Sequence, residues 1–342
     1  MPRHVVGVFL VVAALLVLSG CRPSGPAGKG TDPHIAVEGA LTSLERQTAV
    51  GYGFPAGGTF TVARSGLARG TLTLKDQQVP ALRVGGNLYL RAPTGYWEAQ
   101  GMPAERAAGY GSRWARSTLA LDPGVVLAPD GLARALRAAI PAGAQAERLT
   151  LGDGTELFDV DGLQVTAAEP YRVTSFRPSL LGPAGPPVLG NTAVEVRAVG
   201  ADGLAGLRTG LGGDVDGLGQ PFVAGPVVAT KVTQNSLRCT AGGACTDSVH
   251  VENELIGEGP QALARLVMKS SVTSSPLGTR ECGQELVTPL NGSVTMSCAV
   301  KFDLPRANGA AKVSAVPTVT AEPVAVVDVA SMKQEIATAL GT

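Results

Sequence analysis

The sequence predicts a mainly β (α+β) protein in which an antiparallel sheet with covering helices precedes an antiparallel β-sandwich. In the first half, apolar residues alternate with Thr, Lys and Arg over short runs, as in strands that bury one face. In the second half, short strand-like runs recur between turn residues, a pattern typical of sandwiches. The 342 residues include 45 Gly and 24 Pro, which favour turns over long helices.

The amino terminus, residues 1–20, has the pattern of a lipoprotein signal peptide. The basic residues Arg3 and His4 precede 14 apolar residues at 5–18, fewer than the ~20 that a membrane-spanning helix needs. The run ends in Leu-Ser-Gly-Cys21, which resembles the bacterial lipobox, a motif whose Cys thiol is joined to diacylglycerol. The alternative is an ordinary secretory signal with an incidental Cys.

Residues 21–33 are polar and rich in Pro and Gly, and we expect them to form a lipidated tether. Several acyl chains on Cys21, such as palmitate, would anchor the protein stably, because each buried CH₂ contributes about 0.8 kcal/mol. We therefore expect an extracytoplasmic protein that the lipid on Cys21 anchors to the cell membrane.

The four remaining cysteines, Cys239, Cys245, Cys282 and Cys298, predict two disulfides, because their number is even and the expected compartment is oxidising. A tight turn separates the first two, and two strand-like halves around an Asn-Gly turn separate the other two. This favours the pairs Cys239–Cys245 and Cys282–Cys298. A four-cysteine metal site is the alternative, but the Cys-x₂-Cys spacing is missing.

The charge balance argues against nucleic acid as a partner. Lys and Arg number 28, as do Asp and Glu, so the formal net charge is zero. Proteins that bind nucleic acid normally carry a strongly basic face.

Residues 34–180 are expected to form a first module. Asp32-Pro33 is typical of a helix start, and the apolar spacing predicts a helix over 33–48. Strand-like runs follow with a hairpin at Gly85-Gly86, then a short helix over 131–140 and further strands. Eight residues form the apolar face expected under the helices: Phe60, Val62, Leu72, Leu74, Leu82, Val84, Leu88 and Leu90.

Three segments resemble the amino-terminal module of many actinobacterial lipoproteins: Val-Gly-Gly-Asn-Leu-Tyr-Leu-Arg at 84–91, Arg113-Trp114, and Glu-Pro-Tyr-Arg-Val at 169–173. That module is similar to the LolA and LppX/LprG-like fold, a curved antiparallel half-barrel whose open side is plugged by helices. The resemblance covers about 150 residues. It implies that the eight apolar residues line a space for acyl chains; the alternative is that they only pack against the 33–48 helix.

Residues 181–190, rich in Gly and Pro, are expected to link this module to a second one over 191–342. A leucine stripe predicts a helix over 203–219 despite seven glycines, and Asp328 is expected to cap a last amphipathic helix. Residues 237–253 resemble part of the Ig-like modules of actinobacterial surface proteins, although this half of the chain has no Trp.

No catalytic signature accompanies these elements, so we expect that the protein is not an enzyme. A hydrolase is the least favoured alternative. His34 and His250, the histidines beyond the signal peptide, are expected at a helix start and on a strand surface. Residues 159–162 and 214–217, both Asp-Val-Asp-Gly, resemble calcium loops but lack further oxygen ligands and a terminal Glu. We therefore expect turn roles for them, and no metal or cofactor.

Aromatic residues gather in a Gly- and Pro-rich stretch at Tyr96-Trp97 and at 110–114. We expect them to close the open end of the half-barrel; ligand contact is the alternative. The sequence thus predicts a cell-envelope lipoprotein that binds or carries a lipid-like ligand non-covalently. The alternative is a ligand-free surface protein with an envelope protein as partner.

Overall fold

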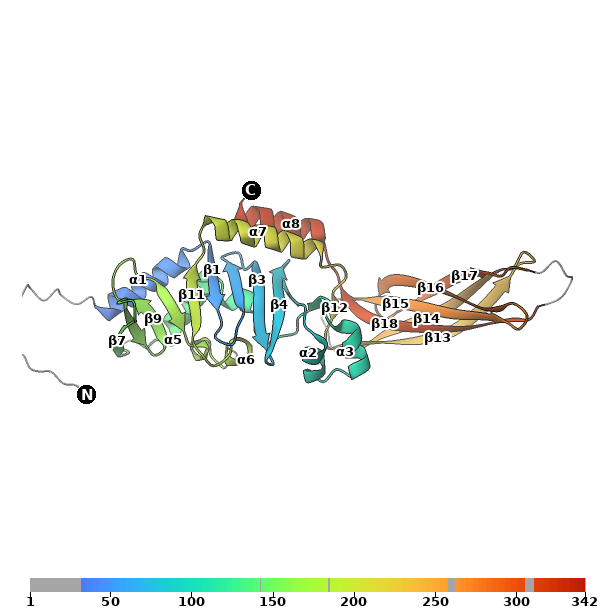
Figure 1. The fold of residues 1–342 in the computed structure, drawn as a ribbon, viewed down its shortest axis with the longest axis horizontal. Helices are drawn as coiled ribbons and strands as arrows, with labels where there is room; N and C mark the ends of the chain where they lie inside the picture. The colour runs from blue at the N-terminus through green and yellow to red at the C-terminus, as the bar shows by residue number, and fades with distance from the viewer. Residues whose placement is uncertain (1–31, 142, 184, 258–261, 305–310, 342) are drawn as a thin grey trace, which may run out of the picture.

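Strands account for most of the regular structure. The computed structural model describes residues 32–341 apart from 142, 184, 258–261 and 305–310. Within these ranges it contains 18 strands, eight α-helices and one 3₁₀-helix, so the mainly β prediction is confirmed. The signal peptide, Cys21 and the tether up to residue 31 lie outside the described residues, whereas Asp32 and Pro33, expected at the end of the tether, begin the first helix. In Figure 1 the molecule is elongated: helices surround the strands at one end, and strands β13–β18 extend away at the other.

Eleven strands form an antiparallel run in the order β6-β5-β4-β3-β2-β1-β11-β10-β9-β8-β7 within the described ranges. Their bounds are β1 Ala49–Gly53, β2 Thr59–Ala63, β3 Ala68–Leu74, β4 Gln77–Val84, β5 Asn87–Leu90, β6 Ala115–Arg116, β7 Ala146–Thr150, β8 Glu156–Val160, β9 Leu163–Thr166, β10 Val173–Phe176 and β11 Val194–Ala198. The predicted hairpin joins β4 to β5, and both Gly85 and Gly86 have the positive φ (59° and 70°) that such a turn requires.

Short elements connect and cover these strands. They are α2 Thr94–Ala99, α3 Ala104–Tyr110, α4 Pro123–Val126, the 3₁₀-helix η1 Pro178–Leu181, α6 Gly185–Leu189 and the two-residue strand β12 Phe222–Val223. The sheet, its helices and these connections are called the helix-covered module below (residues 33–223 and 329–340).

Each face of the sheet packs against its own pair of helices. The inner face is covered by α1 (Pro33–Glu45) and α5 (Pro129–Ala139), and the outer face by α7 (Ala201–Asp216) and α8 (Val329–Leu340). Strand β5 shows the division, because side chains alternate between faces along a strand. Leu88 and Leu90 belong to the inner core, whereas Tyr89 packs in the outer core.

Helix α1 begins where the sequence predicts. The Asp32 side chain accepts a hydrogen bond from the His34 backbone N–H at 2.9 Å, and Pro33 occupies the first helical position. Leu41 and Leu44 are among the residues that the helix buries against the inner face. The helix ends at Glu45, three residues before the predicted end.

The expected boundary between the modules is corrected by the strand pairing. Residues 181–190 do not separate two folded units, because β11, which follows them, pairs with β1 on one side and β10 on the other. Within 181–190, α6 buries Val188 and Leu189 in the inner core. Helices α7 and α8, both expected in the second module, also cover the first sheet. The module beyond the sheet is therefore residues 227–325, inserted between α7 and α8.

Helix α7 forms despite its glycines, as predicted, because its apolar stripe is buried. Leu207, Leu211 and Val215 pack on the outer face next to Met332 of α8. At Gly210 a side chain would meet the Arg69 side chain at 2.8 Å. This close approach lets Arg69 donate to the Asp214 carboxylate, one turn further along, at 2.5 Å.

The inserted part, called the distal module (residues 227–325), consists of two sets of three long strands. One set is β13 Val227–Cys239, β14 Ala244–Ile256 and β17 Gly292–Lys301; the other is β16 Gly278–Pro289, β15 Ala262–Ser274 and β18 Val313–Ala325. Apolar side chains of the two sets share a core that includes Val249, Val251, Leu266 and Met268. The second set continues through β12 into the sheet of the helix-covered module.

Both predicted disulfides are present. Cys239–Cys245 closes the β13–β14 hairpin, and Cys282–Cys298 joins β16 to β17, which belong to different sets of strands. Disulfides persist in oxidising compartments outside the cytoplasm, which fits the expected extracytoplasmic location. In the described part of the chain, no helix has the length and hydrophobicity that crossing a bilayer would require.

Candidate functional site

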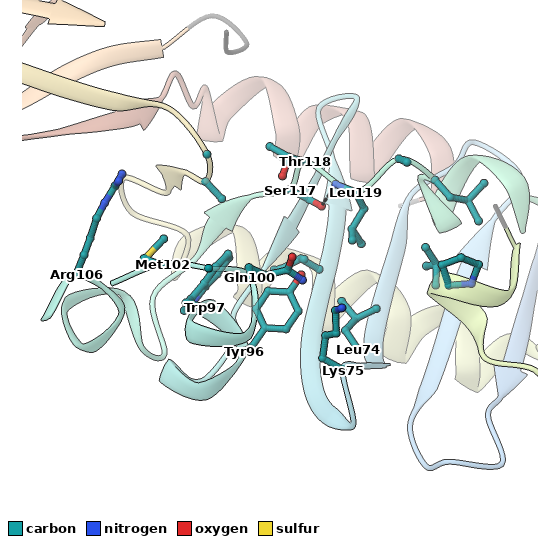
Figure 2. A pocket seen from close by; sticks show the side chains of 18 of the residues that line it. Leu74, Lys75, Tyr96, Trp97, Gln100, Met102, Arg106, Ser117, Thr118 and Leu119 are labelled. Atoms are coloured by element: carbon teal, nitrogen blue, oxygen red, sulfur yellow. Dashed lines mark hydrogen bonds between the residues drawn. The ribbon is translucent and has the colours of Figure 1, made fainter. Parts of the chain in front are cut away.

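The candidate site is an apolar cavity of about 700 Å³ at the junction between the two modules (Figure 2). This volume lies within the roughly 300–1,000 Å³ typical of small-molecule sites. Its walls come from six parts of the chain: the end of β3 and the turn after it, β5, α2 with the start of α3, residues 117–121, residues 187–188, and residues 224–227. Side chains that face it include Leu74, Leu90, Tyr96, Trp97, Met102, Leu119 and Val188.

Aromatic rings build the wall next to the distal module. Tyr96 and Trp97 are buried on α2, with ring centroids 4.9 Å apart in an edge-to-face arrangement. Phe222 of β12 lies 5.1 Å from Trp97 and stacks on Tyr110 at 3.9 Å. Such contacts orient the rings as well as burying them. These rings therefore form one packed cluster, which is continuous with the strand that leads into the distal module.

Two cations line the cavity. Lys75 lies in the β3–β4 turn, and Arg106 lies on α3 near the distal module. Arg106 donates to the Pro226 carbonyl at 3.0 Å, and its guanidinium carbon lies 5.4 Å from the centre of the Tyr110 ring. No Asp or Glu of the described residues lines the cavity.

Neutral polar groups complete the lining. The Trp97 side chain is buried, and its indole N–H has no hydrogen-bond partner among the described residues. Burial raises the pKa of the Tyr96 phenol, and a hydrogen bond with Gln100 opposes this shift, so the phenol is uncharged at neutral pH. The site can bind an apolar chain and donate hydrogen bonds to oxygen atoms on it.

The eight apolar residues singled out by the sequence do not form one surface. Six lie in the inner core: Phe60, Val62, Leu72, Leu74, Leu88 and Leu90. Only Leu74 and Leu90 of these line the cavity. Leu82 and Val84 point to the outer face, where they pack with α7 and α8. The single apolar face is therefore corrected: β4 buries both of its faces, and alternation alone does not show which face an apolar residue joins.

The aromatic residues from the Gly- and Pro-rich stretch are the ones that the structure brings to the cavity. Trp97 and Tyr96 line it, and Tyr110 supports the wall through Phe222. Trp114 instead packs in the outer core beneath α7. Sequence reasoning missed Phe222 and Arg106. Phe222 lies within the expected second module over 191–342, and the signal that marks it is that Phe222 and Phe302 are the only aromatic residues after position 181.

The other candidate residues have structural roles. The Asp159 carboxylate accepts from the Gly162 backbone N–H at 2.9 Å, as expected for a turn. The turn expected at 214–217 is wrong, because Asp214 and Asp216 lie in the last turn of α7, where they pair with Arg69 and Lys333, respectively. No cluster of three His, Cys, Asp or Glu residues suited to a metal occurs in the described ranges. His250 Nδ1 lies 3.3 Å from the Thr295 hydroxyl on the neighbouring strand.

Comparisons with protein-family models, with curated proteins and with solved structures gave no match to this chain.

Proposed function

We propose that the protein is a membrane-anchored lipoprotein of the cell envelope that binds a lipid-like ligand non-covalently in the cavity of its helix-covered module. In this account, the sheet and helices act as a half-barrel of the LolA and LppX/LprG-like type, and the distal module is an Ig-like sandwich that spaces the cavity or contacts a partner. The observation that carries the proposal is the cavity of about 700 Å³ with an apolar, aromatic lining.

The lining supports a hydrophobic ligand. Leu74, Leu90, Met102, Leu119 and Val188 present aliphatic or thioether surface to the cavity. Burial of apolar surface contributes about 25 cal/mol per Å², so a ligand chain that covers this lining gains affinity without any covalent bond. Thioether and aliphatic side chains also adapt to chains of different shape.

The position of the cavity supports a carrier role. It lies between the inner core and the first residues of the distal module, not beneath α1. A ligand could therefore enter and leave without displacing α1 or α5. The proposed anchor at Cys21 would hold this site near the membrane, where lipids are available.

Native mass spectrometry of the Cys21→Ser form, expressed in an envelope-bearing host and secreted, tests the proposal. We expect bound mass that leaves on organic extraction. Leu119→Trp should reduce it, because the larger side chain takes up part of the cavity. Leu151→Trp is the matched control, since Leu151 is exposed and remote from the cavity lining. If the parent form shows only the mass of the unliganded protein, the ligand-free interaction protein is favoured. If Leu119→Trp and Leu151→Trp lose bound mass equally, the ligand does not bind in this cavity.

A further inference from the structure

We propose that the cavity selects an anionic acyl amphiphile: one hydrocarbon chain that carries a negatively charged head and an oxygen that accepts a hydrogen bond from the Trp97 indole. This inference rests on the proposed function and adds the chemistry of the ligand. Three features of the lining support it: the sign of its charges, the backbone at Lys75, and the unpaired donor of Trp97.

Both charged side chains that line the cavity are cations, Lys75 and Arg106. The neighbouring acids in the sequence, Asp76 and Glu105, are exposed and do not line it. The Lys75 side chain, which is also exposed, makes no hydrogen bond or ion pair with any described residue, so its ammonium group is available to a ligand. An apolar cavity with cations and no facing carboxylate attracts a negative head group and disfavours a positive one.

The backbone holds Lys75 at this position against its ordinary preference. The β3–β4 turn places Lys75 and Asp76 at φ 51° and 60°. Hairpin turns of this kind favour Asn and Gly, which adopt positive φ with less strain. Non-glycine residues in this region recur at ligand sites, where the side chain is needed and the surrounding structure maintains the conformation. The side chain held in this way is that of Lys75, which lines the cavity together with Tyr96 and Gln100 (Figure 2).

The Trp97 indole supplies the second recognition element. Trp97 is 3% exposed, and its Nε1 has no hydrogen-bond partner within the described residues. A buried donor without a partner is costly, and its cost is removed when a ligand oxygen accepts the bond. The ring forms part of the cavity wall, but its nitrogen has almost no exposed surface there, so the ring must shift before a carboxylate, ester or phosphate oxygen of the ligand can accept this bond.

Tryptophan fluorescence provides a direct experiment. The chain has two Trp, and Trp114 lies in the outer core, so Trp97 is the only reporter in a Trp114→Phe variant. This variant, in the Cys21→Ser form, is titrated with palmitate and with hexadecyltrimethylammonium, which has a chain of equal length and a positive head without oxygen. We expect palmitate to change the Trp97 emission and to bind at least tenfold more tightly than the cation.

Two substitutions test the individual contacts. Lys75→Gln should weaken palmitate binding about threefold while Lys231→Gln, at an exposed lysine of the distal module, leaves it unchanged. Trp97→Phe keeps an aromatic ring, although a smaller one, and removes the donor, and calorimetry should show palmitate affinity about twofold to tenfold lower.

The outcomes separate this inference from the proposed function. Equal or tighter binding of the cation would overturn the anionic head while leaving a hydrophobe carrier intact. Unchanged palmitate affinity in Trp97→Phe would overturn the indole contact. If neither amphiphile binds and native spectra of the parent form show no bound hydrophobe, the proposed function fails as well.

Discussion

Arg113 of the helix-covered module donates two hydrogen bonds to Glu322 of the distal module, from Nη1 to Oε2 at 3.0 Å and from Nη2 to Oε1 at 2.7 Å. Arg265 adds a third bond to Glu322 at 2.8 Å and holds Glu285 through two more. Planar bidentate pairs of this kind fix orientation as well as adding stability. The distal module is therefore braced at the edge of the cavity wall rather than joined by a free linker.

Glu322→Gln should lower the free energy of unfolding by about 1–3 kcal/mol at pH 7, because it removes the charge from a half-buried carboxylate held by two arginines. Burial raises the pKa of Glu322, but the hydrogen bonds from Arg113 and Arg265 outweigh this, so its pKa lies below the ordinary value. The contribution of Glu322 to stability is thus present at neutral pH and is lost as pH falls through this lowered pKa.

Thermal unfolding between pH 7 and pH 3 measures this effect. The difference in Tm between the parent protein and Glu322→Gln should shrink in acid. Glu254→Gln, at an exposed strand position, serves as the control and should change little at either pH. A difference between parent and Glu322→Gln that grows in acid would contradict the brace.

Met332→Ala should destabilise the helix-covered module by about 2–4 kcal/mol, because Met332 of α8 is buried against the outer face of the sheet. Gln334→Ala, on the exposed side of the same helix, should be nearly neutral. Hydrogen exchange should show faster exchange in α7 for Met332→Ala alone. If only the distal module lost protection, the assignment of α8 to the first sheet would be wrong.

Removal of the Cys282–Cys298 disulfide should cost more than removal of Cys239–Cys245. The chain-entropy model gives about 3.1 kcal/mol for the longer loop and about 2.4 kcal/mol for the shorter one. The longer loop also links two different sets of strands, whereas the shorter one lies within a hairpin. Denaturant unfolding of the two double Cys→Ser variants checks the order, and a larger loss for the hairpin disulfide would reverse our interpretation.

Cys21→Ser should release the protein from the membrane fraction, because the proposed acyl chains have no other attachment point. Fractionation followed by immunoblotting measures the distribution. Retention of an unacylated Cys21→Ser protein in the membrane fraction would show that another contact holds it there.

Local features of the fold could be predicted from the sequence. The Asp32-Pro33 helix start, the Gly85-Gly86 hairpin and the disulfide pairing each depend on neighbouring residues, whose chemistry restricts the backbone. The Gly-rich helix α7 was also predictable from the spacing of its apolar residues. Such signals act over short stretches, where few conformations compete.

Long-range relationships could not be predicted in the same way. The pairing of β11 with β1 joins segments more than 140 residues apart, and a Gly- and Pro-rich stretch before β11 suggested a boundary that is not there. The lining of the cavity comes from six separate parts of the chain, so no local pattern identifies it. Leu82 and Leu72 have the same sequence pattern but opposite faces, because helices cover both sides of the sheet.

The most direct test of a ligand in the cavity uses the methionine methyl groups. Met102 lines the cavity, Met268 and Met296 lie in the distal core, and Met332 of α8 packs against the outer face of the sheet. NMR spectra of ¹³C-methyl-Met protein in the Cys21→Ser form, recorded before and after addition of palmitate, therefore report on each site separately. We predict that the Met102 signal shifts and shows contacts to the ligand chain while the other three stay in place. An unchanged Met102 signal, or a shift confined to Met332 or to the distal core, would contradict the account.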